Sequence, residues 1–347
     1  MKIVVLYDGA AQGWSDEDIR QVVGSASVIA DILRSAGHEV QRVPVRPGLR
    51  WLAACRKADA VFNLCEGIGA VSRYEALVAG TLELADVPFT GARPEVIALC
   101  HRKPVCNALL AARGLPVPRW VVPTGHRVPT DFPLPAIVKP AAEDASVGIN
   151  QDSVVTTRRA LALRVARLSE EHDEVLVQQY VGGRELAVGF VGQRALPMSE
   201  IDFSSMPSGA WPILSFSAKW DVGGEEDLGS RPVCPAPLPK IVADRLTATA
   251  REAWTAVGGG GYGRVDLRLD ESGQPWILEV NPNPDIADDA GLSRMAHAAG
   301  WSYEALILRI MDAALSEAQR TRSVALLAHG ARSRNDRRPA GEQSKLA

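Results

Sequence analysis

The sequence lacks any long apolar run, and no stretch approaches the ~18 consecutive apolar residues that a membrane span needs. The apolar stretch at the start of the chain, Met1–Tyr7, is also too short for the hydrophobic region of a signal peptide. This stretch is instead typical of a first buried strand. These absences predict a cytoplasmic protein that contacts no membrane.

A large excess of one charge is also absent, because 38 basic and 41 acidic residues leave a formal net charge of −3. That balance gives no electrostatic reason to expect nucleic acid or an anionic surface as a partner. The expected partners are therefore small molecules, and a homodimer stays open. The chain has five cysteines without the paired spacing of zinc sites, so we expect reduced thiols: Cys55, Cys65, Cys100, Cys106 and Cys234.

Two segments near residue 270 carry the strongest chemical signal. Arg264-Val-Asp266 and Leu278-Glu279-Val-Asn281-Pro282 alternate apolar and polar residues, as β-strands do. A hairpin through residues 270–273 would bring Asp266, Glu279 and Asn281 together on one face. Oxygen ligands of this kind suit Mg²⁺, which keeps waters and substrate phosphates in its other positions. The alternative is that these charges form an ordinary solvated face.

Two earlier segments favour a magnesium–nucleotide site. Residues 136–140 read as a short apolar strand that ends in Lys139, and the small-residue loop 143–148 that follows could wrap phosphates through its backbone N–H groups. Residues 174–185 then read as a strand that runs into a glycine turn. A lysine, a flexible loop, a polar edge strand and metal carboxylates are together the parts that Mg-ATP requires. The glycine run 258–263 follows a helix and precedes a strand, so it predicts a helix end rather than a dinucleotide loop.

This order of motifs resembles the ATP-grasp superfamily, and within it the D-alanine–D-alanine ligase-like family. The resemblance runs from about residue 1 to 315. It implies an α/β fold with three domains: an N-terminal parallel βαβ domain (1–95), a central α+β lid (96–184) and a C-terminal α+β domain (185–318). ATP would lie between the last two domains, and residues 319–347 would form a polar, loosely ordered tail.

The predicted elements agree with this division. We expect strands at 2–6, 39–43 and 60–63 with helices at 19–37 and 72–85, which is the pattern of a parallel sheet. Later helices are predicted at 96–112, 157–171, 238–257 and 303–317, and a strand at 175–180.

The resemblance also implies roles for single residues. ATP phosphates would contact Lys103 and Lys139, under a lid formed by Ser146, Val147 and Gly148. Adenine and ribose would be held by Gln178, the backbone near Tyr180 and Val181, and Glu185. The metal ligands would be Asp266, Glu279 and Asn281. They would hold two Mg²⁺ ions, for which Mn²⁺ would substitute. Arg264, Lys139 and Lys219 would be catalytic, because positive charge offsets the charge that builds up on phosphoryl and carbonyl oxygens.

The amino-acid pockets depart from the family pattern. The serine that helps to hold the acceptor carboxylate is replaced by Ala290, the first lid serine by Ala145, and a tyrosine on the substrate loop by Trp220. We therefore expect a ligase that joins other amino acids or small peptides. The substrate-side candidates are Glu66, Glu75, Trp220, Asp285 and Gly291; the two glutamates could equally be satisfied surface carboxylates. The alternatives are a genuine D-alanine–D-alanine ligase, a small-molecule kinase and a non-catalytic ATP-binding module.

Overall fold

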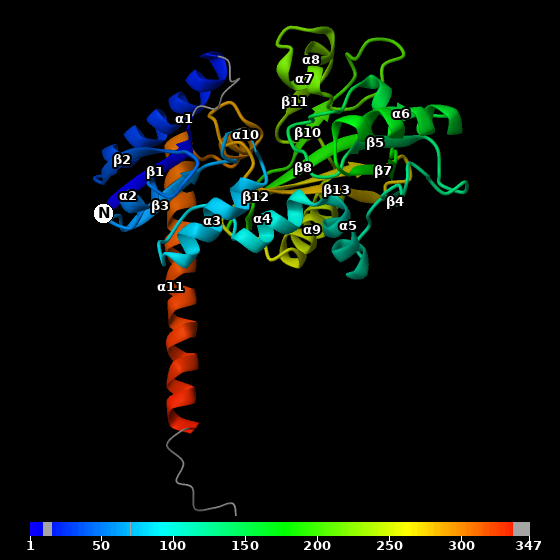
Figure 1. Cartoon of the computed structure of the whole chain (residues 1–347). Coiled ribbons are helices and arrows are strands. Elements are labelled where there is room, and N and C mark those ends of the chain that lie inside the picture. The colour runs from blue at the N-terminus through cyan, green and yellow to red at the C-terminus, as the bar shows by residue number, and fades with distance from the viewer. Residues whose placement is uncertain (10–15, 70, 336–347) are drawn as a thin grey trace, which may run out of the picture.

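The computed structural model describes residues 1–9, 16–69 and 71–335. The strands within these ranges form three separate sheets, one parallel and two antiparallel, with helices packed against them (Figure 1). None of the helices found there is both long and apolar enough to cross a membrane.

The first sheet is parallel, as the alternation of strands and helices predicted, and its strands lie in the order β2-β1-β3. Its region comprises β1 (Lys2–Asp8), α1 (Asp16–Ser35), β2 (Glu39–Val45), α2 (Leu52–Cys55), β3 (Ala60–Leu64) and α3 (Tyr74–Leu84). Because successive strand residues point to opposite faces, Ile3 and Val5 pack with α1, while Val4 and Leu6 pack with α2 and α3. Both faces of the sheet are therefore covered.

The C-terminal helices return to this first sheet. Helices α10 (Gly291–Ala298) and α11 (Tyr303–Asn335) bring Met295, Ile307 and Ile310 into the same apolar cluster as Ile3 and Val5. The predicted helix end at 317 was wrong, since α11 continues to Asn335 and projects beyond the body of the molecule (Figure 1). Its extension is rich in Ala, Arg and Leu and contains no proline, so the helical state suits it. Residues 336–347 of the predicted tail lie outside the described ranges.

The second sheet is antiparallel and lies in the predicted central region. Its order is β4-β7-β5-β6, and Lys139 pairs with Leu176 across β5 and β7. The elements are β4 (Trp120–Val121), β5 (Ala136–Pro140), η1 (Gln151–Ser153), β6 (Val154–Val155), α6 (Arg158–Glu171) and β7 (Val175–Gln179). Helix α6 begins at the Thr157 cap and buries Leu161 and Val165 against this sheet.

The third sheet is the largest and carries the predicted metal hairpin. Its strands run β11-β10-β8-β12-β13, with β9 also paired to β8. The strands are β8 (Arg184–Val191), β9 (Arg194–Ala195), β10 (Ser199–Asp202), β11 (Arg231–Val233), β12 (Tyr262–Leu269) and β13 (Pro275–Pro282); the helices are α7 (Phe216–Trp220), α8 (Glu225–Gly229) and α9 (Lys240–Ala256). Helix α9 buries Trp254 against the sheet, and Gly258–Gly261 then connect it to β12, as predicted.

The predicted helix at 96–112 is two helices, α4 (Pro94–His101) and α5 (Lys103–Ala112), with a break at Arg102. Pro104 explains the break, because its ring would clash with the preceding turn of a continuous helix and it donates no hydrogen bond. Both helices pack on the third sheet, where Ile97 and Leu110 join Leu186 and Val280 in one core. The break places Lys103 at the first turn of α5, facing the site.

Candidate active site

The metal hairpin forms as the sequence predicted. Strands β12 and β13 pair so that Asp266 lies opposite Glu279 and Arg264 opposite Asn281, which puts all four side chains on one face. Arg264 grips Asp266 with two parallel hydrogen bonds, Nε to Oδ1 at 2.7 Å and Nη2 to Oδ2 at 2.9 Å. Burial alone would lower the pKa of Arg264, but Asp266 outweighs it, so the guanidinium stays charged.

This donor set fits Mg²⁺ better than a protein-only metal cage. Within the described ranges, no three His, Cys, Asp or Glu side chains gather closely enough to hold a metal ion. The predicted set offers two carboxylates and one amide, Asp266, Glu279 and Asn281. Mg²⁺ is usually bound by one or two carboxylates, while waters and phosphates fill its remaining positions.

Lys103 links Glu279, one of the predicted metal ligands, to the loop of residues 143–148. Its ammonium lies 2.6 Å from the backbone oxygen of Glu143, 2.9 Å from Oδ1 of Asp144 and 3.6 Å from Oε2 of Glu279. The side chain is buried, which would lower its pKa, but the Glu279 and Asp144 carboxylates raise the pKa overall. Lys103 is therefore a permanent cation at the edge of the site.

Lys139 is also a buried cation, but its surroundings differ from those of Lys103. Among the described residues, no carboxylate lies within the 4.0 Å ion-pair distance of its ammonium, although Glu279, Glu185 and Asp266 act on it from farther away. Its side chain is only 7% exposed, and burial lowers the pKa of Lys139 to about 8. A buried ammonium without a close acid is ready to receive an anionic ligand.

The expected nucleobase side contains a polar group that lacks a partner. Gln178 is buried between β4 and β5, and its Nε2 makes no hydrogen bond to any residue that the structure describes. A buried amide donor without an acceptor is uncommon in a folded protein. A purine ring nitrogen is an acceptor that would satisfy Gln178, so this residue fits the predicted nucleotide site.

The loop of residues 143–148, called the lid loop below, has an unusual backbone conformation. Ala145 and Ser146 have φ angles of 53° and 62°, a left-handed region that costs non-glycine residues about 1–3 kcal/mol each. Contacts with Leu214 and Trp220 hold this conformation. Ser146 Oγ donates to the Leu214 carbonyl at 2.7 Å, and Trp220 Nε1 donates to the Ala145 carbonyl at 3.1 Å. Position 148 also requires glycine, because a Cβ atom there would lie 2.7 Å from Pro140 Cγ. Val147, which lies between Ser146 and Gly148 in the chain, is exposed.

Comparison with known proteins agrees with this geometry. The family model "D-ala D-ala ligase C-terminus" matches residues 109–312. A D-alanine--D-alanine ligase from Gluconobacter oxydans is 35% identical over 312 residues, covering 88% of this chain and 96% of that protein. The chain belongs to the D-alanine–D-alanine ligase family. It is thus an ATP-dependent ligase that forms a C–N bond.

Solved structures show the same ATP-grasp fold. The D-alanine--D-alanine ligase from Bacillus anthracis in complex with ATP superposes with a TM-score of 0.75 at 20% identity, covering 92% of this chain and 99% of that one. The VanG D-Ala:D-Ser ligase from Enterococcus faecalis gives a TM-score of 0.71 at 19% identity, with coverage of 90% and 99%.

Arg268 is a residue of this ligase that the sequence reasoning missed. Its buried guanidinium donates to Glu185 Oε2 at 2.6 Å, to the Val181 carbonyl at 3.1 Å and to the Tyr180 hydroxyl at 3.2 Å. It also donates to the carbonyl of Pro212. Three predicted nucleotide residues are thereby organised around one arginine. The signal was present, because Arg268 continues the alternation of Arg264 and Asp266 on β12.

On the substrate side of the ligase, Lys219 and Gly291 lie near Arg264. Burial lowers the pKa of Lys219, and the charge of Arg264 lowers it further. A Cβ atom at Gly291 would lie 3.7 Å from Arg264 Nη1, so the start of α10 adjoins the arginine. Ala290 caps this helix without a side-chain hydrogen bond, so no hydroxyl is offered at that point.

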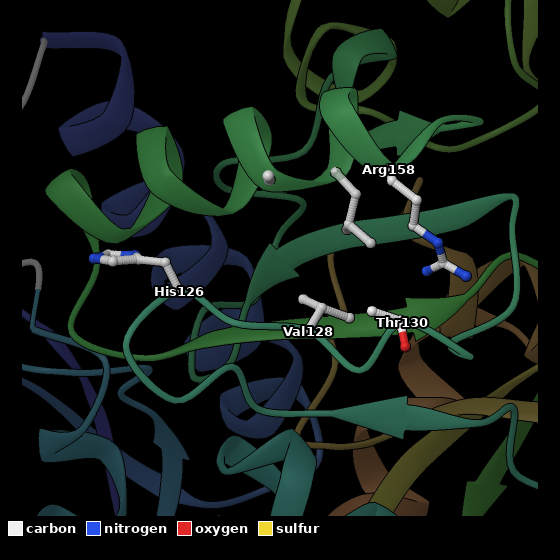
Figure 2. Close-up of a pocket in the computed structure, with 6 residues that line it drawn as sticks. His126, Val128, Thr130 and Arg158 are labelled. Carbon is white, nitrogen blue, oxygen red and sulfur yellow. The ribbon is translucent and has the colours of Figure 1, made fainter.

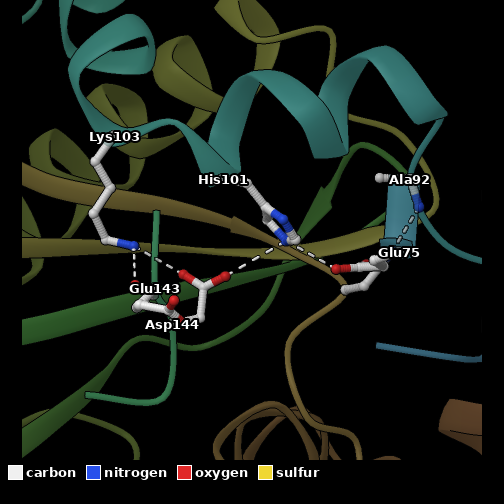
Figure 3. Close-up of polar contacts among 7 residues, drawn as sticks. Glu75, Ala92, His101, Lys103, Glu143 and Asp144 are labelled. Carbon is white, nitrogen blue, oxygen red and sulfur yellow. Dashed lines mark hydrogen bonds and ion pairs between the residues drawn. The ribbon is translucent and has the colours of Figure 1, made fainter. Parts of the chain in front are cut away.

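The two predicted substrate glutamates of the ligase differ. Glu75 is buried, and both of its oxygens are engaged: Oε1 accepts from Asn283 Nδ2 at 2.7 Å, and Oε2 lies 2.9 Å from His101 Nε2 (Figure 3). Glu66 instead reaches solvent beside Asp285. Although part of Glu66 is exposed, the protein crowds its carboxyl group and reduces its hydration, and together with the Asp285 and Glu75 carboxylates this raises the pKa of Glu66 to about 7. Glu66 is therefore the freer carboxylate for a substrate ammonium.

His101 and Asn283 were also missed. Asn283 has a φ of 53° and accepts at Oδ1 from the backbone N–H of Ala92 at 2.6 Å, so the end of β13 is tied to the first region of the chain. Gly91 allows this approach, since a Cβ atom there would lie 2.6 Å from Asn283 Oδ1. These contacts join residues almost two hundred positions apart, and sequence spacing carries no signal for them.

A hollow elsewhere in the ligase does not belong to the site. It has a volume of about 220 Å³ and is lined by His126, Val128, Thr130, Arg158, Leu161 and Ala162 (Figure 2). The guanidinium of Arg158 already donates to the carbonyl of Phe132. None of the predicted site residues lines this hollow.

Proposed function

We propose that this ligase activates an amino-acid carboxylate as an acyl phosphate and joins it to the amine of another amino acid or small peptide. The observation that carries the proposal is the buried ammonium of Lys139: no carboxylate of the described residues lies within 4.0 Å of it, and Glu279 and Asp266 act on it from farther away. An uncompensated buried cation next to metal-binding carboxylates suits a nucleotide that brings both phosphates and Mg²⁺.

Two steps make up the reaction. A carboxylate oxygen of the first substrate attacks the γ-phosphorus of ATP, and the bond to the bridging oxygen breaks to release ADP. The amine nitrogen of the second substrate then attacks the acyl carbon, phosphate leaves, and the nitrogen loses a proton. Arg264 and Lys139 would stabilise the negative charge that accumulates on the phosphoryl and carbonyl oxygens.

Asp266, Glu279 and Asn281 would hold two Mg²⁺ ions, with Mn²⁺ as a substitute. The metal would neutralise charge on the β- and γ-phosphates. Lys103 would contact the phosphates, while Gln178, Val181 and Glu185 would hold adenine and ribose.

We propose further that D-alanine is not the principal substrate. Ala290, Ala145 and Trp220 remove hydroxyl groups that the family pattern places around a small dipeptide precursor. Each lost hydrogen bond to a charged carboxylate costs roughly 1.5–3 kcal/mol, so two losses correspond to about a hundred-fold in affinity. Trp220 is half exposed and presents a large apolar ring that a methyl group would not fill.

The second candidate is a genuine D-alanine–D-alanine ligase of cell-wall synthesis. The relatives favour it, since the Gluconobacter oxydans protein carries that activity in its name and covers nearly the same length. The VanG structure is titled a D-Ala:D-Ser ligase, so a different second substrate accompanies a similar fold.

An ADP-release screen over pairs of amino acids, with product masses, tests the proposal. A product mass equal to two substrates minus water, with a larger amino acid preferred, supports it. Efficient turnover of D-alanine alone at millimolar concentration or below, to D-alanyl-D-alanine, establishes the second candidate. A phosphorylated product would indicate a kinase, and ATP binding without any product would indicate a non-catalytic module.

A further inference from the structure

One carboxylate of the lid loop lies between two cations that face the phosphate side of the site. Asp144 Oδ1 lies 2.9 Å from Lys103 Nζ, and Asp144 Oδ2 lies 3.5 Å from His101 Nε2 (Figure 3). Both cations come from the break between α4 and α5. The Asp144 carboxylate therefore lies where a negatively charged phosphate of the nucleotide is expected to bind.

Lys103 is surrounded by acceptors in this arrangement. It donates two of its three hydrogen bonds, to the Glu143 carbonyl and to Asp144 Oδ1, and Glu279 Oε2 lies 3.6 Å from its ammonium. A phosphate oxygen can take the place of Asp144 on Lys103 only if that carboxylate leaves. Glu279 is a proposed metal ligand, whereas Asp144 belongs to the lid loop and can leave with it.

The Nε2 atom of His101 also contacts a second carboxylate, that of Glu75. Glu75 lies 2.9 Å from its Nε2, and Asn283 fixes Glu75 in turn. Burial alone would lower the pKa of His101, but the Glu75 and Asp144 carboxylates outweigh burial and raise the pKa above its ordinary value. The two carboxylates thus favour the protonated form of His101, which carries a second positive charge beside Lys103.

The backbone next to Asp144 is also strained. Ala145 and Ser146 both adopt the left-handed region, which side chains rarely occupy. Such a conformation persists only where surrounding contacts impose it, and it is common in segments that move on ligand binding. The ion pairs of Asp144 are among the contacts that impose it here.

We propose that Asp144 occupies the place of a nucleotide phosphate on Lys103 and His101, and that ATP binds by displacing it. His101 then becomes a second cationic contact for the phosphates. This inference rests on the proposed phosphate role of Lys103. The Asp144 carboxylate then competes with the nucleotide for the same cations. The lid loop is released from them only when a phosphate displaces this carboxylate.

The decisive experiment is calorimetric titration of Asp144→Asn with Mg-ATP and with adenosine, in the absence of amino acids. Removal of the competing charge should tighten Mg-ATP binding about ten-fold, in line with a charge-assisted contact, while adenosine affinity stays unchanged because adenosine has no phosphate. Asp152→Asn is the matched control, since it removes an exposed carboxylate of the same region and should change neither affinity. His101→Gln should weaken Mg-ATP several-fold and leave adenosine unchanged.

The result that overturns the inference is an Asp144→Asn variant whose Mg-ATP affinity is unchanged or weaker, or one that changes Mg-ATP and adenosine alike. If Asp144→Asn does not fold, Asp144→Ser supports the same comparison, since it also removes the charge. A wild-type protein that binds adenosine and Mg-ATP equally would remove the phosphate role of Lys103, and with it the proposed function. Tight Mg-ATP binding to the wild type without a gain in either Asp144 variant would overturn this inference alone.

Discussion

On the proposed nucleotide side, the buried Lys139 ammonium has no carboxylate within ion-pair distance and the buried Gln178 Nε2 has no hydrogen bond, among the described residues. On the substrate side, Glu75 is buried with both oxygens bonded, while Glu66 stays open to solvent. A buried group without a partner is costly unless a ligand completes it. The nucleotide side is therefore constrained by one expected ligand, whereas Glu66 on the substrate side can change without leaving a buried charge unpaired.

The largest expected effect follows from removing the charge of the proposed metal ligands. Asp266→Asn or Glu279→Gln should lower turnover by at least about a hundred-fold with little change in melting temperature, because a neutral amide no longer balances the metal charge. Steady-state ADP release with varied Mg²⁺ measures the effect. Glu271→Gln, an exposed residue of the same hairpin, is the control. Normal Mg²⁺-dependent turnover in both variants would remove the metal assignment.

The second prediction concerns the unpaired cation. Lys139→Ala should weaken ATP binding about ten-fold or more, because it removes a charge-assisted contact worth typically ~1.5–3 kcal/mol. Titration calorimetry measures it, with the exposed Lys240→Ala as the control. Unchanged ATP affinity and turnover in Lys139→Ala would return Lys139 to a structural role.

The third prediction tests the substrate side. Trp220→Ala should raise the KM of the preferred larger amino acid about ten-fold, through lost apolar contact, and leave the KM of ATP unchanged. Leu228→Ala, an exposed apolar residue of the neighbouring helix α8, should have no effect. An equal loss for small and large amino acids would show that Trp220 acts on the lid rather than on the substrate.

The smallest expected effect is a pH dependence from Glu66. Its pKa is raised to about 7, so the side chain is neutral below that pH and carries a negative charge above it. The KM for the amino substrate should therefore fall several-fold as the pH rises from 6 to 8. The Glu66→Gln variant should lose this dependence. A pH profile of KM that is identical in the two proteins would exclude Glu66 as the ammonium contact.

Local patterns were enough to predict the metal hairpin, because residues 264–282 form two adjacent strands and alternation decides the face of each side chain. The central strand that ends in Lys139 was predictable for the same reason. The helix break at Arg102 was readable from Pro104, and the longer α11 was missed because polar composition was taken as disorder. Contacts such as His101 with Glu75 and Asp144 depend on how separate elements pack, so spacing along the chain could not reveal them.

The return of α11 to the first sheet has a consequence for the order of synthesis. Ile3 and Val5 belong to a core that Ile307 and Ile310 complete. At roughly 5–20 residues per second, the ribosome needs about 15–60 s to make the intervening chain. During that interval α1 alone covers this face of the first sheet, so the nascent N-terminal segment keeps apolar surface exposed until α11 is made.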